Sequence, residues 1–334
     1  MMKAFVVNRY GRKNGARAGD MPVPELREDD VLVEIHAAGV NPLDAKIRDG
    51  EFKRILRYRL PLILGNDLAG IVVRVGSRVQ RFKVGDEVYA RPPKDRIGTF
   101  AEFIAIREDA VALKPEALNM EEAASIPLVG LTAWQALVER AQLKKGQKVL
   151  IHAGSGGIGT FAIQLAKHLG ATVATTASGA NAEWMKQLGA DIVIDYRKDD
   201  FAAVLKDFDV VLDTQGGKTL EKSLHVLKPG GKVIGIAGPP DPEFATQVNA
   251  SWFLKMAVRF LSHRIRKEAR RRDVDYSFLF MRADGEQLAR IARLVDAAVI
   301  KPVIDRIFPF ESTQEALAYV ESGRAKGKVV IKIR

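Results

Sequence analysis

The residues of this sequence best suited to binding a ligand are three glycines in one short stretch, Gly154-Ser-Gly156-Gly157-Ile-Gly159. They follow the apolar stretch 148–153 and precede 160–170, where apolar residues recur at helical spacing. In such a strand–turn–helix unit, the first glycine permits a sharp turn, the second lets the backbone approach a pyrophosphate, and the third lets the helix pack on the strand. Free N–H groups at the helix start then bind phosphate oxygens. The pattern predicts a dinucleotide site, and the alternative is a tight glycine turn without a ligand.

The end of the next expected strand, 172–177, indicates which dinucleotide is bound. An NAD site places Asp or Glu about 20 residues after the turn, where it accepts hydrogen bonds from the ribose hydroxyls. This strand ends without an acid, and Thr176 and Ser178 offer hydroxyls instead. Arg197 and Lys198, after the third strand, add positive charge. The prediction is NADP, and the alternative is that the two cations only solvate a loop.

The composition limits the classes of protein and of chemistry. A chain of 334 residues with 47% hydrophobic and 28% charged residues is typical of a globular protein with two domains. Cysteine is absent, which excludes disulfides, thiolate nucleophiles and cysteine-ligated metals, and favours a reducing, cytoplasmic location. The first residues lack the apolar core of a signal peptide, and no apolar run reaches the roughly 18 residues of a membrane span.

Hydrophobic patterning divides the chain into two regions. Short strand patterns separated by glycine turns fill the first 120 or so residues and predict an antiparallel, barrel-like domain. From Lys148, strands and helices alternate, which predicts a doubly wound parallel sheet. The α/β chain is therefore expected to have a β domain at 1–121 and 284–334 and a nucleotide domain at 122–283. Pro115 and the acidic Glu121-Glu122 open an expected helical segment that runs through 123–126, and a second helix is expected at 132–141. Strands of the parallel sheet are expected at 148–153, 172–177, 192–196, 209–214, 232–237 and 277–281.

Further motifs lie along nearly the whole chain, around Asn41-Pro-Leu-Asp44, Gly65-Asn-Asp67, Gly85-Asp86, Gly98-Thr-Phe and Lys328-Val-Val. With these motifs and the glycine turn, the chain resembles the medium-chain dehydrogenase/reductase superfamily. It is similar to the zinc-free quinone oxidoreductase branch of that family and, within it, to the NADPH-dependent alkenal/enone oxidoreductases. The resemblance implies a GroES-like β-barrel domain and a Rossmann domain, with the C-terminal tail rejoining the first domain.

The resemblance also bears on metal and on reaction. Zinc-dependent members of the family need Cys where this chain has Asn41, and a His-Glu pair where it has Asn66-Asp67. Two amides and isolated acids do not supply the donors of a catalytic zinc, so no metal is expected. The implied reaction is hydride transfer from NADPH to the conjugated double bond of an α,β-unsaturated carbonyl, or to a quinone. A homodimer is implied as well.

The enone-reductase resemblance assigns Lys46 and Asn41 to the catalytic site. Lys46 would contact the nicotinamide half of the cofactor and the substrate, and either orient them or supply the proton. A surface ion pair with Asp44 is the alternative for Lys46. Asn41 would donate a hydrogen bond in the substrate pocket or, alternatively, serve as a turn residue before Pro42, while Asp44 is expected to be structural. Thr132 would contact the nicotinamide or simply cap its helix.

The resemblance further assigns cofactor contacts at several strand ends. The turn itself is expected at the pyrophosphate, Ser178 and Tyr196 at the 2′-phosphate, and residues 236–238 beside the nicotinamide. One departure weakens the preference for NADP, since relatives often carry Lys where this chain has Asn181, and Arg197 or Lys198 would have to replace it. The expected cofactor residues are Lys46, Thr132, Gly154, Ser155, Gly156, Gly157, Ile158, Gly159, Ser178, Tyr196, Arg197, Ile236, Ala237, Gly238 and Lys328.

Residues 249–275 form a segment that is longer and more basic than the resemblance predicts. An apolar stripe at helical spacing alternates with arginines, which predicts an amphipathic helix. Either the stripe packs on the protein or on a second subunit, or the helix binds an anionic membrane or nucleic acid. The last reading gives an alternative function, a nucleotide-sensing binding protein that acts through this helix. The apolar stripe comprises Phe253, Met256, Ala257, Phe260, Leu261 and Ile265.

Overall fold

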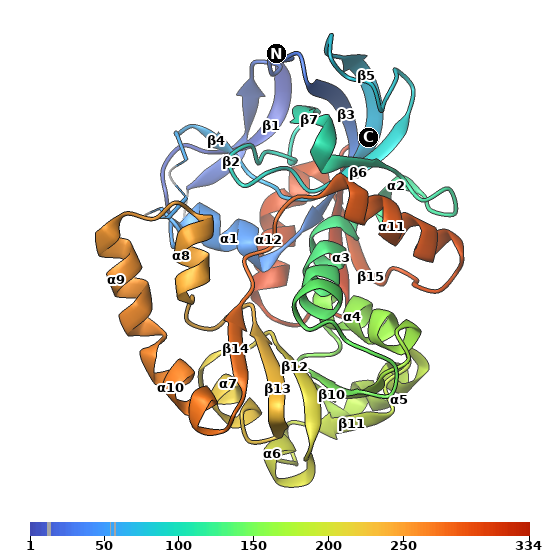
Figure 1. The fold of residues 1–334 in the computed structure, drawn as a ribbon. Helices are drawn as coiled ribbons and strands as arrows, with labels where there is room; N and C mark the ends of the chain where they lie inside the picture. Colours follow the sequence, from blue (N-terminus) through green and yellow to red (C-terminus); the bar gives the residue numbers. More distant parts are fainter. Residues whose placement is uncertain (12–14, 54, 57) are drawn as a thin grey trace. The chain divides into compact units, whose positions relative to one another are not determined.

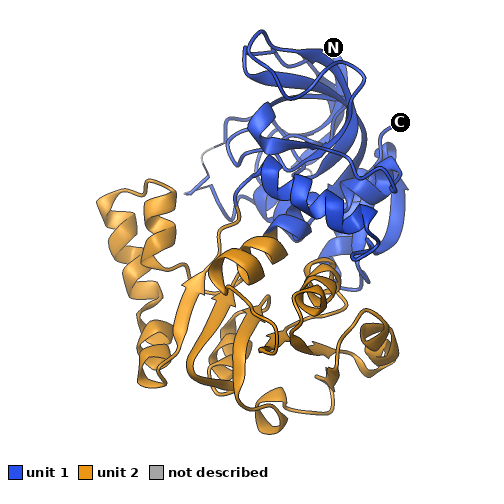
Figure 2. Ribbon diagram, turned by 45° about the vertical axis from the view of Figure 1, so that its right-hand side comes forward, with its two compact units in different colours: residues 1–131, 282–334 blue, residues 132–281 orange. Residues whose placement is uncertain are grey.

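The computed structural model describes residues 1–11, 15–53, 55–56 and 58–334. Its elements are labelled in chain order in Figure 1. The chain forms two compact units, which Figure 2 colours separately. Unit 1 comprises Met1–Leu131 and Arg282–Arg334, and unit 2 comprises Thr132–Met281. No helix of the described chain is long and apolar enough to cross a membrane.

Unit 1 is built mainly from β-strands. A seven-stranded sheet has the order β15-β16-β3-β5-β6-β8, with β7 also paired to β3, and a smaller sheet has the order β2-β1-β4. The last strand, β16, pairs antiparallel with β3, so the tail rejoins the N-terminal sheet as predicted. The elements are β1 (Met2–Val7), β2 (Ala16–Met21), β3 (Asp30–Val40), α1 (Pro42–Asp49), β4 (Leu62–Ile63), β5 (Leu68–Val75), β6 (Glu87–Ala90), β7 (Phe103–Arg107), η1 (Glu108–Ala110), β8 (Val111–Leu113), α2 (Met120–Ala124), α11 (Gly285–Asp296), β15 (Ile304–Pro309), η4 (Phe310–Ser312), α12 (Thr313–Glu321) and β16 (Lys328–Lys332).

Unit 2 contains the predicted parallel sheet. Its six strands have the order β11-β10-β9-β12-β13-β14, and every neighbouring pair is parallel. The chain runs outward from β9 in one direction and then restarts at β12 on its other side, so the turn after β9 lies at the switch point where such sheets bind ligands. Helix α3 (Pro127–Trp134) belongs to both units, since unit 1 ends at Leu131 and unit 2 begins at Thr132. The other elements of unit 2 are η2 (Gln135–Arg140), β9 (Lys148–Ile151), α4 (Gly157–His168), β10 (Thr172–Ala177), η3 (Gly179–Asn181), α5 (Ala182–Gln187), β11 (Ile192–Asp195), α6 (Phe201–Val204), β12 (Phe208–Asp213), α7 (Gly217–Ser223), β13 (Leu227–Gly235), α8 (Pro242–Gln247), α9 (Trp252–Leu261), α10 (His263–Arg271) and β14 (Asp275–Phe278).

Two helix predictions were wrong in their bounds. The helix expected at 132–141 begins earlier, at Pro127, and continues into the π-helical turn η2. Proline suits a first helical position because its fixed φ is helical and its missing N–H would have no partner there. The basic segment forms two helices, α9 and α10, that meet at Ser262. The buried Ser262 hydroxyl donates to the carbonyl of Val258 at 2.9 Å, a bond that is associated with helix bending.

Candidate cofactor site in unit 2 and polar cluster in unit 1

The glycine turn connects the end of β9 to the start of α4. Ala153 adopts a φ of +54°, a left-handed conformation that reverses the chain directly after the strand. The Gly154 amide then donates to the Thr176 carbonyl at 2.9 Å, and the Gly156 amide donates to the Ala153 carbonyl at 3.0 Å. The turn is thereby fixed to β10 on one side and closed on itself on the other.

The three glycines of the turn are required for different reasons. A Cβ on Gly154 would clash with the Thr175 hydroxyl, and a Cβ on Gly159 would lie 2.6 Å from the Cα of Gly154. A Cβ on Gly156 would meet only the Ala153 carbonyl, at an ordinary 3.4 Å. The first and third glycines therefore satisfy packing within the protein. The second is needed only if something outside the protein approaches the backbone, as a pyrophosphate does.

The backbone amides at the start of α4 supply donors for such a ligand. Gly157, Ile158 and Gly159 are its first three residues, and their N–H groups have no carbonyl one turn earlier within the helix. The first amide bonded in helical fashion is that of Thr160, which donates to Gly156 at 2.9 Å. Because Ser155, Gly157 and Ile158 are only half-buried, an anion can reach this end of the helix. The geometry fits a phosphate group.

The end of β10 lies beside an acidic side chain that was not predicted from the sequence. Ser178 is half-buried and directly follows β10. The register pairs Ala177 with Asp195, the last residue of β11, and a Cβ on Gly179 would lie 2.5 Å from the Asp195 carboxylate. An acidic side chain therefore does lie at this strand end, although it comes from β11. Tyr196 is 59% exposed.

Arg197 follows Tyr196 and supplies the cation expected at this strand end. Its guanidinium lies over the Tyr196 ring, 5.8 Å from the ring centre. Its backbone amide donates to the Asp195 carboxylate at 3.1 Å. A carboxylate and a guanidinium therefore lie within two residues of each other at the predicted 2′-phosphate position.

Thr176 does not offer its hydroxyl to a phosphate, contrary to the prediction. The hydroxyl accepts a hydrogen bond from the Ala153 amide and lies 3.1 Å from Nδ1 of His152. On the other side of the imidazole, Nε2 lies 2.9 Å from the Ser223 hydroxyl, which itself donates to the Thr219 carbonyl. Ser223 must therefore accept from Nε2–H, and Thr176 donates to Nδ1. Burial lowers the pKa of His152 to about 4, so this strand-end imidazole is neutral and structural.

The ends of β12 and β13 lie at the same edge of the parallel sheet as the glycine turn. Ile236 and Gly238 are half-buried and Ala237 is exposed, just beyond the end of β13. Asp213, at the end of β12, was not among the predicted site residues, and its carboxylate accepts from the Gly216 amide at 2.9 Å. Burial raises the pKa of Asp213. The neighbouring Thr214 hydroxyl donates to the His152 carbonyl at 3.1 Å, which ties this loop to the glycine turn.

Lys46 lies on α1 in unit 1, and its side chain is exposed. Within the described residues it has no hydrogen-bond or ion-pair partner, so the alternative of an ion pair with Asp44 is wrong. Asp44 is fully buried and instead accepts from the Asn41 amide at 2.7 Å, which caps the start of α1. Arg48 holds the other end of the helix through two hydrogen bonds to Glu321 on α12, at 3.0 and 3.1 Å. Lys46 is thus a free cation on a fixed helix.

Asn41 is 2% exposed, and both ends of its amide are already paired. Its Nδ2 donates to the Asp67 carboxylate at 2.9 Å, while its Oδ1 accepts from the Lys328 ammonium at 2.5 Å. Nδ2 also donates to the Gly39 carbonyl at 3.4 Å, so both of its N–H groups have acceptors within the protein. The predicted role of a substrate-facing donor is therefore corrected. The structure assigns Asn41 to the buried connection between α1 and β16.

The ammonium of Lys328 makes three hydrogen bonds inside unit 1. Besides Asn41, its acceptors are the Val40 carbonyl at 3.2 Å and the Asp67 carboxylate at 3.1 Å. Its side chain is 5% exposed and that of Asp67 is 0% exposed. An ammonium has three N–H donors, so this arrangement leaves none for a cofactor, and the expected cofactor contact is corrected. The other carboxylate oxygen of Asp67 accepts from the Leu128 amide at 2.7 Å.

These buried groups lie at the positions where the sequence resemblance implied the ligands of zinc-dependent family members. No group of three or more His, Cys, Asp or Glu residues in the described chain is arranged to hold a metal ion. The donors present are the amides of Asn41 and Asn66 and the carboxylate of Asp67, and the Lys328 ammonium already bridges two of them. A fixed positive charge beside these donors opposes a second cation.

Thr132 lies inside α3, at the sixth residue of the helix, and is 4% exposed. The alternative that it caps a helix is therefore wrong. It is the first residue of unit 2. Its contact with the nicotinamide stays a prediction.

Comparison with known proteins agrees with this fold. A family model described as "Alcohol dehydrogenase GroES-like domain" matches residues 27–116, and one described as "Zinc-binding dehydrogenase" matches residues 188–331. A solved quinone oxidoreductase from Coxiella burnetii superposes with a TM-score of 0.88 at 33% identity, covering 100% of this chain and 99% of that one. The α/β fold with a GroES-like domain and a Rossmann-like parallel sheet is confirmed.

Two curated relatives extend over the whole chain. The zebrafish "NAD(P)H oxidoreductase RTN4IP1, mitochondrial" is 35% identical over 356 residues, covering 100% of this chain and 92% of the relative. The Arabidopsis thaliana "NADPH-dependent alkenal/one oxidoreductase, chloroplastic" is 36% identical over 341 residues, covering 99% and 79%. The chain therefore belongs to the medium-chain dehydrogenase/reductase superfamily and is an oxidoreductase. Its relatives are alkenal/one and quinone oxidoreductases, as the sequence resemblance predicted.

Proposed function

We propose that this protein is an NADPH-dependent, metal-independent reductase of α,β-unsaturated carbonyl compounds, with quinones as alternative acceptors. One observation carries the proposal: the open backbone at Gly156, beside the free amides that begin α4. That combination favours a pyrophosphate of a dinucleotide. The names of the relatives support a nicotinamide cofactor and the enone and quinone substrate classes. None of these names favours the nucleotide-sensing binding protein.

The residues that would hold the cofactor lie at one edge of the parallel sheet. Gly156, Gly157 and Ile158 would donate backbone hydrogen bonds to the pyrophosphate, and the loop 236–238 would flank the nicotinamide half. Ser178 and Arg197 would contact the 2′-phosphate, and the Tyr196 ring would support the Arg197 guanidinium. The preference for NADPH over NADH rests on these two donors acting against the nearby Asp195 carboxylate.

When bound, NADPH would supply a hydride, and residues of the chain would stabilise the negative charge that develops on the carbonyl oxygen. Addition at the β-carbon moves the electron pair of the double bond toward the carbonyl oxygen, and a proton then adds at the α-carbon. The exposed ammonium of Lys46 would donate a hydrogen bond to that oxygen as negative charge develops. Fixed donors of this kind are worth about 3–4 kcal/mol in comparable sites.

The cluster of Asn41, Asp67 and Lys328 would act as a positioning device. It ties the start of α1 to β16 through buried hydrogen bonds, so the helix that carries Lys46 has a fixed place in unit 1. A homodimer and a cytoplasmic location remain part of the proposal. The cysteine-free composition supports the location.

Steady-state kinetics with a short alkenal, a vinyl ketone and a naphthoquinone test the function. We expect NADPH oxidation that depends on the acceptor, and a fall in kcat of about a hundredfold for Lys46→Ala, with a smaller change in NADPH affinity. Lys53→Ala is the matched control, because Lys53 is also exposed and unpaired in the described chain. Equal rates for the Lys46→Ala and Lys53→Ala variants would remove Lys46 from the reaction. No oxidation with any acceptor would contradict the function.

A further inference from the structure

The surface of α9 in unit 2 carries large apolar side chains that no described residue covers. Trp252 is 67% exposed, Phe253 77% and Phe260 83%, with Met256 at 49% and Leu261 at 62%. The sequence alone did not decide whether this stripe packs on the protein. It does not, apart from Ile265, which lies on α10 and is buried. Contiguous exposed apolar surface of this kind marks an interaction site.

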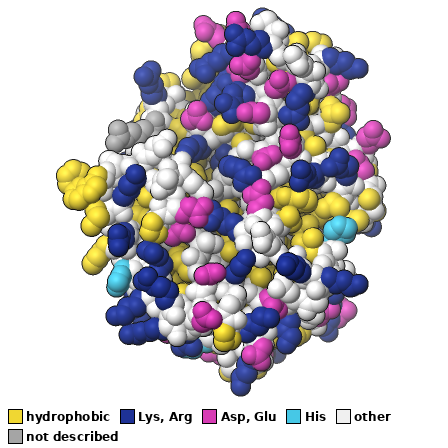
Figure 3. Space-filling model, in the orientation of Figure 1, with side chains coloured by type: hydrophobic (Ala, Val, Ile, Leu, Met, Phe, Trp, Pro, Cys, Tyr) yellow, Lys and Arg dark blue, Asp and Glu magenta, His cyan; other side chains and the backbone are white. Residues whose placement is uncertain are grey.

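The apolar residues share one side of α9. Successive residues of an α-helix turn by about 100°, so Trp252, Met256, Phe260 and Phe253 fall within an arc of about 100°. Val258 faces the opposite side and is buried at 1% exposure. In Figure 3, hydrophobic side chains protrude at the left edge of the molecule, where Figure 1 places α9.

The apolar arc is bordered by positive charge. Lys255 and Arg259 lie along its edge on α9, and both are exposed. Helix α10 continues the same surface, and Figure 3 shows Lys and Arg side chains gathered below the apolar ones. Together α9 and α10 carry seven Lys or Arg residues and one acid, Glu268. We call residues 252–271 the basic-aromatic surface.

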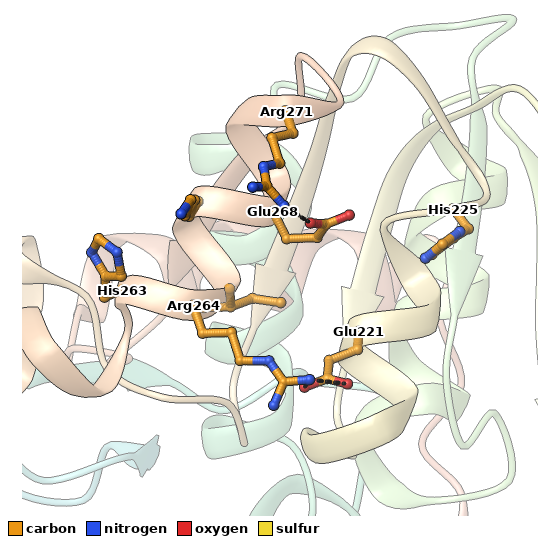
Figure 4. Close-up of a pocket in the computed structure, with 8 residues that line it drawn as sticks. Glu221, His225, His263, Arg264, Glu268 and Arg271 are labelled. Carbon is orange, nitrogen blue, oxygen red and sulfur yellow. Dashed lines mark hydrogen bonds and ion pairs between the residues drawn. The ribbon is translucent and has the colours of Figure 1, made fainter.

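Much of this positive charge has no counter-charge in the described chain. Arg264 pairs with Glu221 at 3.3 Å and Arg271 with Glu268 at 3.5 Å, and both pairs border an open pocket of about 500 Å³ (Figure 4). Lys267, which lines the same pocket, has no ion-pair partner among the described residues. The same holds for Lys255, Arg259, Arg266 and Arg270.

We propose that the basic-aromatic surface docks the protein on an anionic lipid bilayer. Exposed aromatic and aliphatic side chains enter the boundary between headgroups and acyl chains, while the neighbouring Lys and Arg residues contact lipid phosphates. The pocket beside α10 offers Lys267 and two histidines, His225 and His263, to a headgroup. Cytoplasmic membrane leaflets carry the matching negative charge.

Charge complementarity favours a bilayer over the other occupants. A symmetric contact between two copies would place this surface against itself and bring like charges together. The basic residues could contact the phosphates of a nucleic acid, but Met256 and Leu261 have no aromatic face on which a base can stack. A bilayer can contact the apolar side chains and the basic side chains of this surface at the same time. This docking does not depend on the proposed reaction.

Vesicle co-sedimentation of the full chain tests the proposal. We expect binding to phosphatidylcholine vesicles that contain phosphatidylserine, and little binding to phosphatidylcholine alone. The double variant Phe253→Ser/Phe260→Ser should bind about a hundredfold more weakly, since each ring contributes about a factor of ten. Arg259→Gln/Arg270→Gln should lose about fivefold for each charge. The matched controls are Val204→Ser, an apolar residue 58% exposed on α6, and Arg290→Gln/Arg293→Gln on α11, and they should bind like the wild type.

Tryptophan fluorescence adds a local readout, because Trp252 is exposed whereas Trp134 and Trp184 are half-buried. We expect a blue shift on anionic vesicles that Trp252→Phe abolishes while binding persists. Thermal unfolding of every variant should match the wild type.

Four results would overturn the proposal. They are no vesicle binding, unchanged binding by the Phe253→Ser/Phe260→Ser variant, a dimer in solution that this variant converts to monomers, and binding of single-stranded RNA without vesicle binding.

Discussion

The polar cluster in unit 1 and the glycine turn in unit 2 differ in whether their polar groups are paired within the protein. In the cluster, Asn41, Asp67 and Lys328 are buried and satisfy one another at 2.5–3.1 Å. At the turn, the first amides of α4 are partly accessible and have no acceptor in their own helix. Polar groups that are paired internally stabilise and position, whereas polar groups left unpaired at an accessible edge are available to a ligand. Residue type alone does not distinguish the two cases, since Asn41 and Lys328 were both expected at the ligand.

The strongest test of the comparison removes the cation from the cluster. Lys328→Ala leaves the Asp67 carboxylate buried without its counter-charge, and we expect the free energy of unfolding to fall by about 3–5 kcal/mol. Urea unfolding measures the change. Lys332→Ala is the control, because Lys332 is 57% exposed in its pair with Glu121 and should cost under about 1 kcal/mol. Equal losses in the two variants would show that the buried pair is not structural.

The pH dependence of stability provides a second test, because Asp44 is buried beside the same cluster. Burial raises the pKa of Asp44 from 3.8 to about 7, so the folded protein keeps a proton that the unfolded chain releases in this range. The contribution to stability is full below pH 3.8 and is lost as the pH rises through about 7, at no more than about 1.4 kcal/mol per pH unit. Asp44→Asn removes this dependence. We expect the variant to gain stability relative to wild type between pH 4 and 7, measured by thermal unfolding at a series of pH values. Parallel pH profiles would contradict the assignment.

At the glycine turn, we expect protein stability and NADPH affinity to respond to different substitutions. Gly156→Ala adds a methyl group where the protein leaves room, so unfolding should be unchanged while NADPH affinity falls about tenfold, equivalent to about 1.4 kcal/mol. Gly159→Ala overpacks the turn and should lower stability by about 1–3 kcal/mol. Calorimetric titration and thermal unfolding of both variants provide the data. A stability loss for Gly156→Ala with unchanged affinity would make the turn structural.

The smallest expected effect concerns the choice between NADPH and NADH. The Asp195 carboxylate lies beside Gly179, where it would repel a 2′-phosphate. Asp195→Asn should therefore raise the preference for NADPH about fivefold, which corresponds to about 1 kcal/mol for a partly exposed charge. Asp199→Asn, an exposed acid in the same loop, is the control. An unchanged ratio of kcat/KM for the two cofactors would place the 2′-phosphate elsewhere.

Local features of the molecule were predictable from the sequence. The glycine turn and its strand and helix are continuous in the chain, and six strands of unit 2 lie close to their predicted ranges. Their spacing and apolar content carry that information without any long-range contact. The family resemblance, which rests on motifs in order, was confirmed for the same reason.

Features that depend on distant pairs were not predictable. Lys328 meets Asn41 across 287 positions of sequence, and Asp195 reaches Gly179 only through the parallel register of β10 and β11. The apolar stripe of α9 also shows what the sequence could not predict. Periodicity correctly indicated an amphipathic segment, yet which face the fold covers depends on packing, and here Val258 faces inward while Phe260 is exposed.

The central claim is that the open glycine turn holds a reduced nicotinamide cofactor for use on a conjugated acceptor. A single experiment tests it: titrate the full chain with NADPH while following nicotinamide fluorescence, then add a short alkenal to the saturated complex. The account predicts one cofactor bound per chain and, on addition of the alkenal, oxidation of one NADPH for each alkenal reduced. No binding of either NADPH or NADH, or a bound cofactor that stays reduced with every enone and quinone, would contradict it.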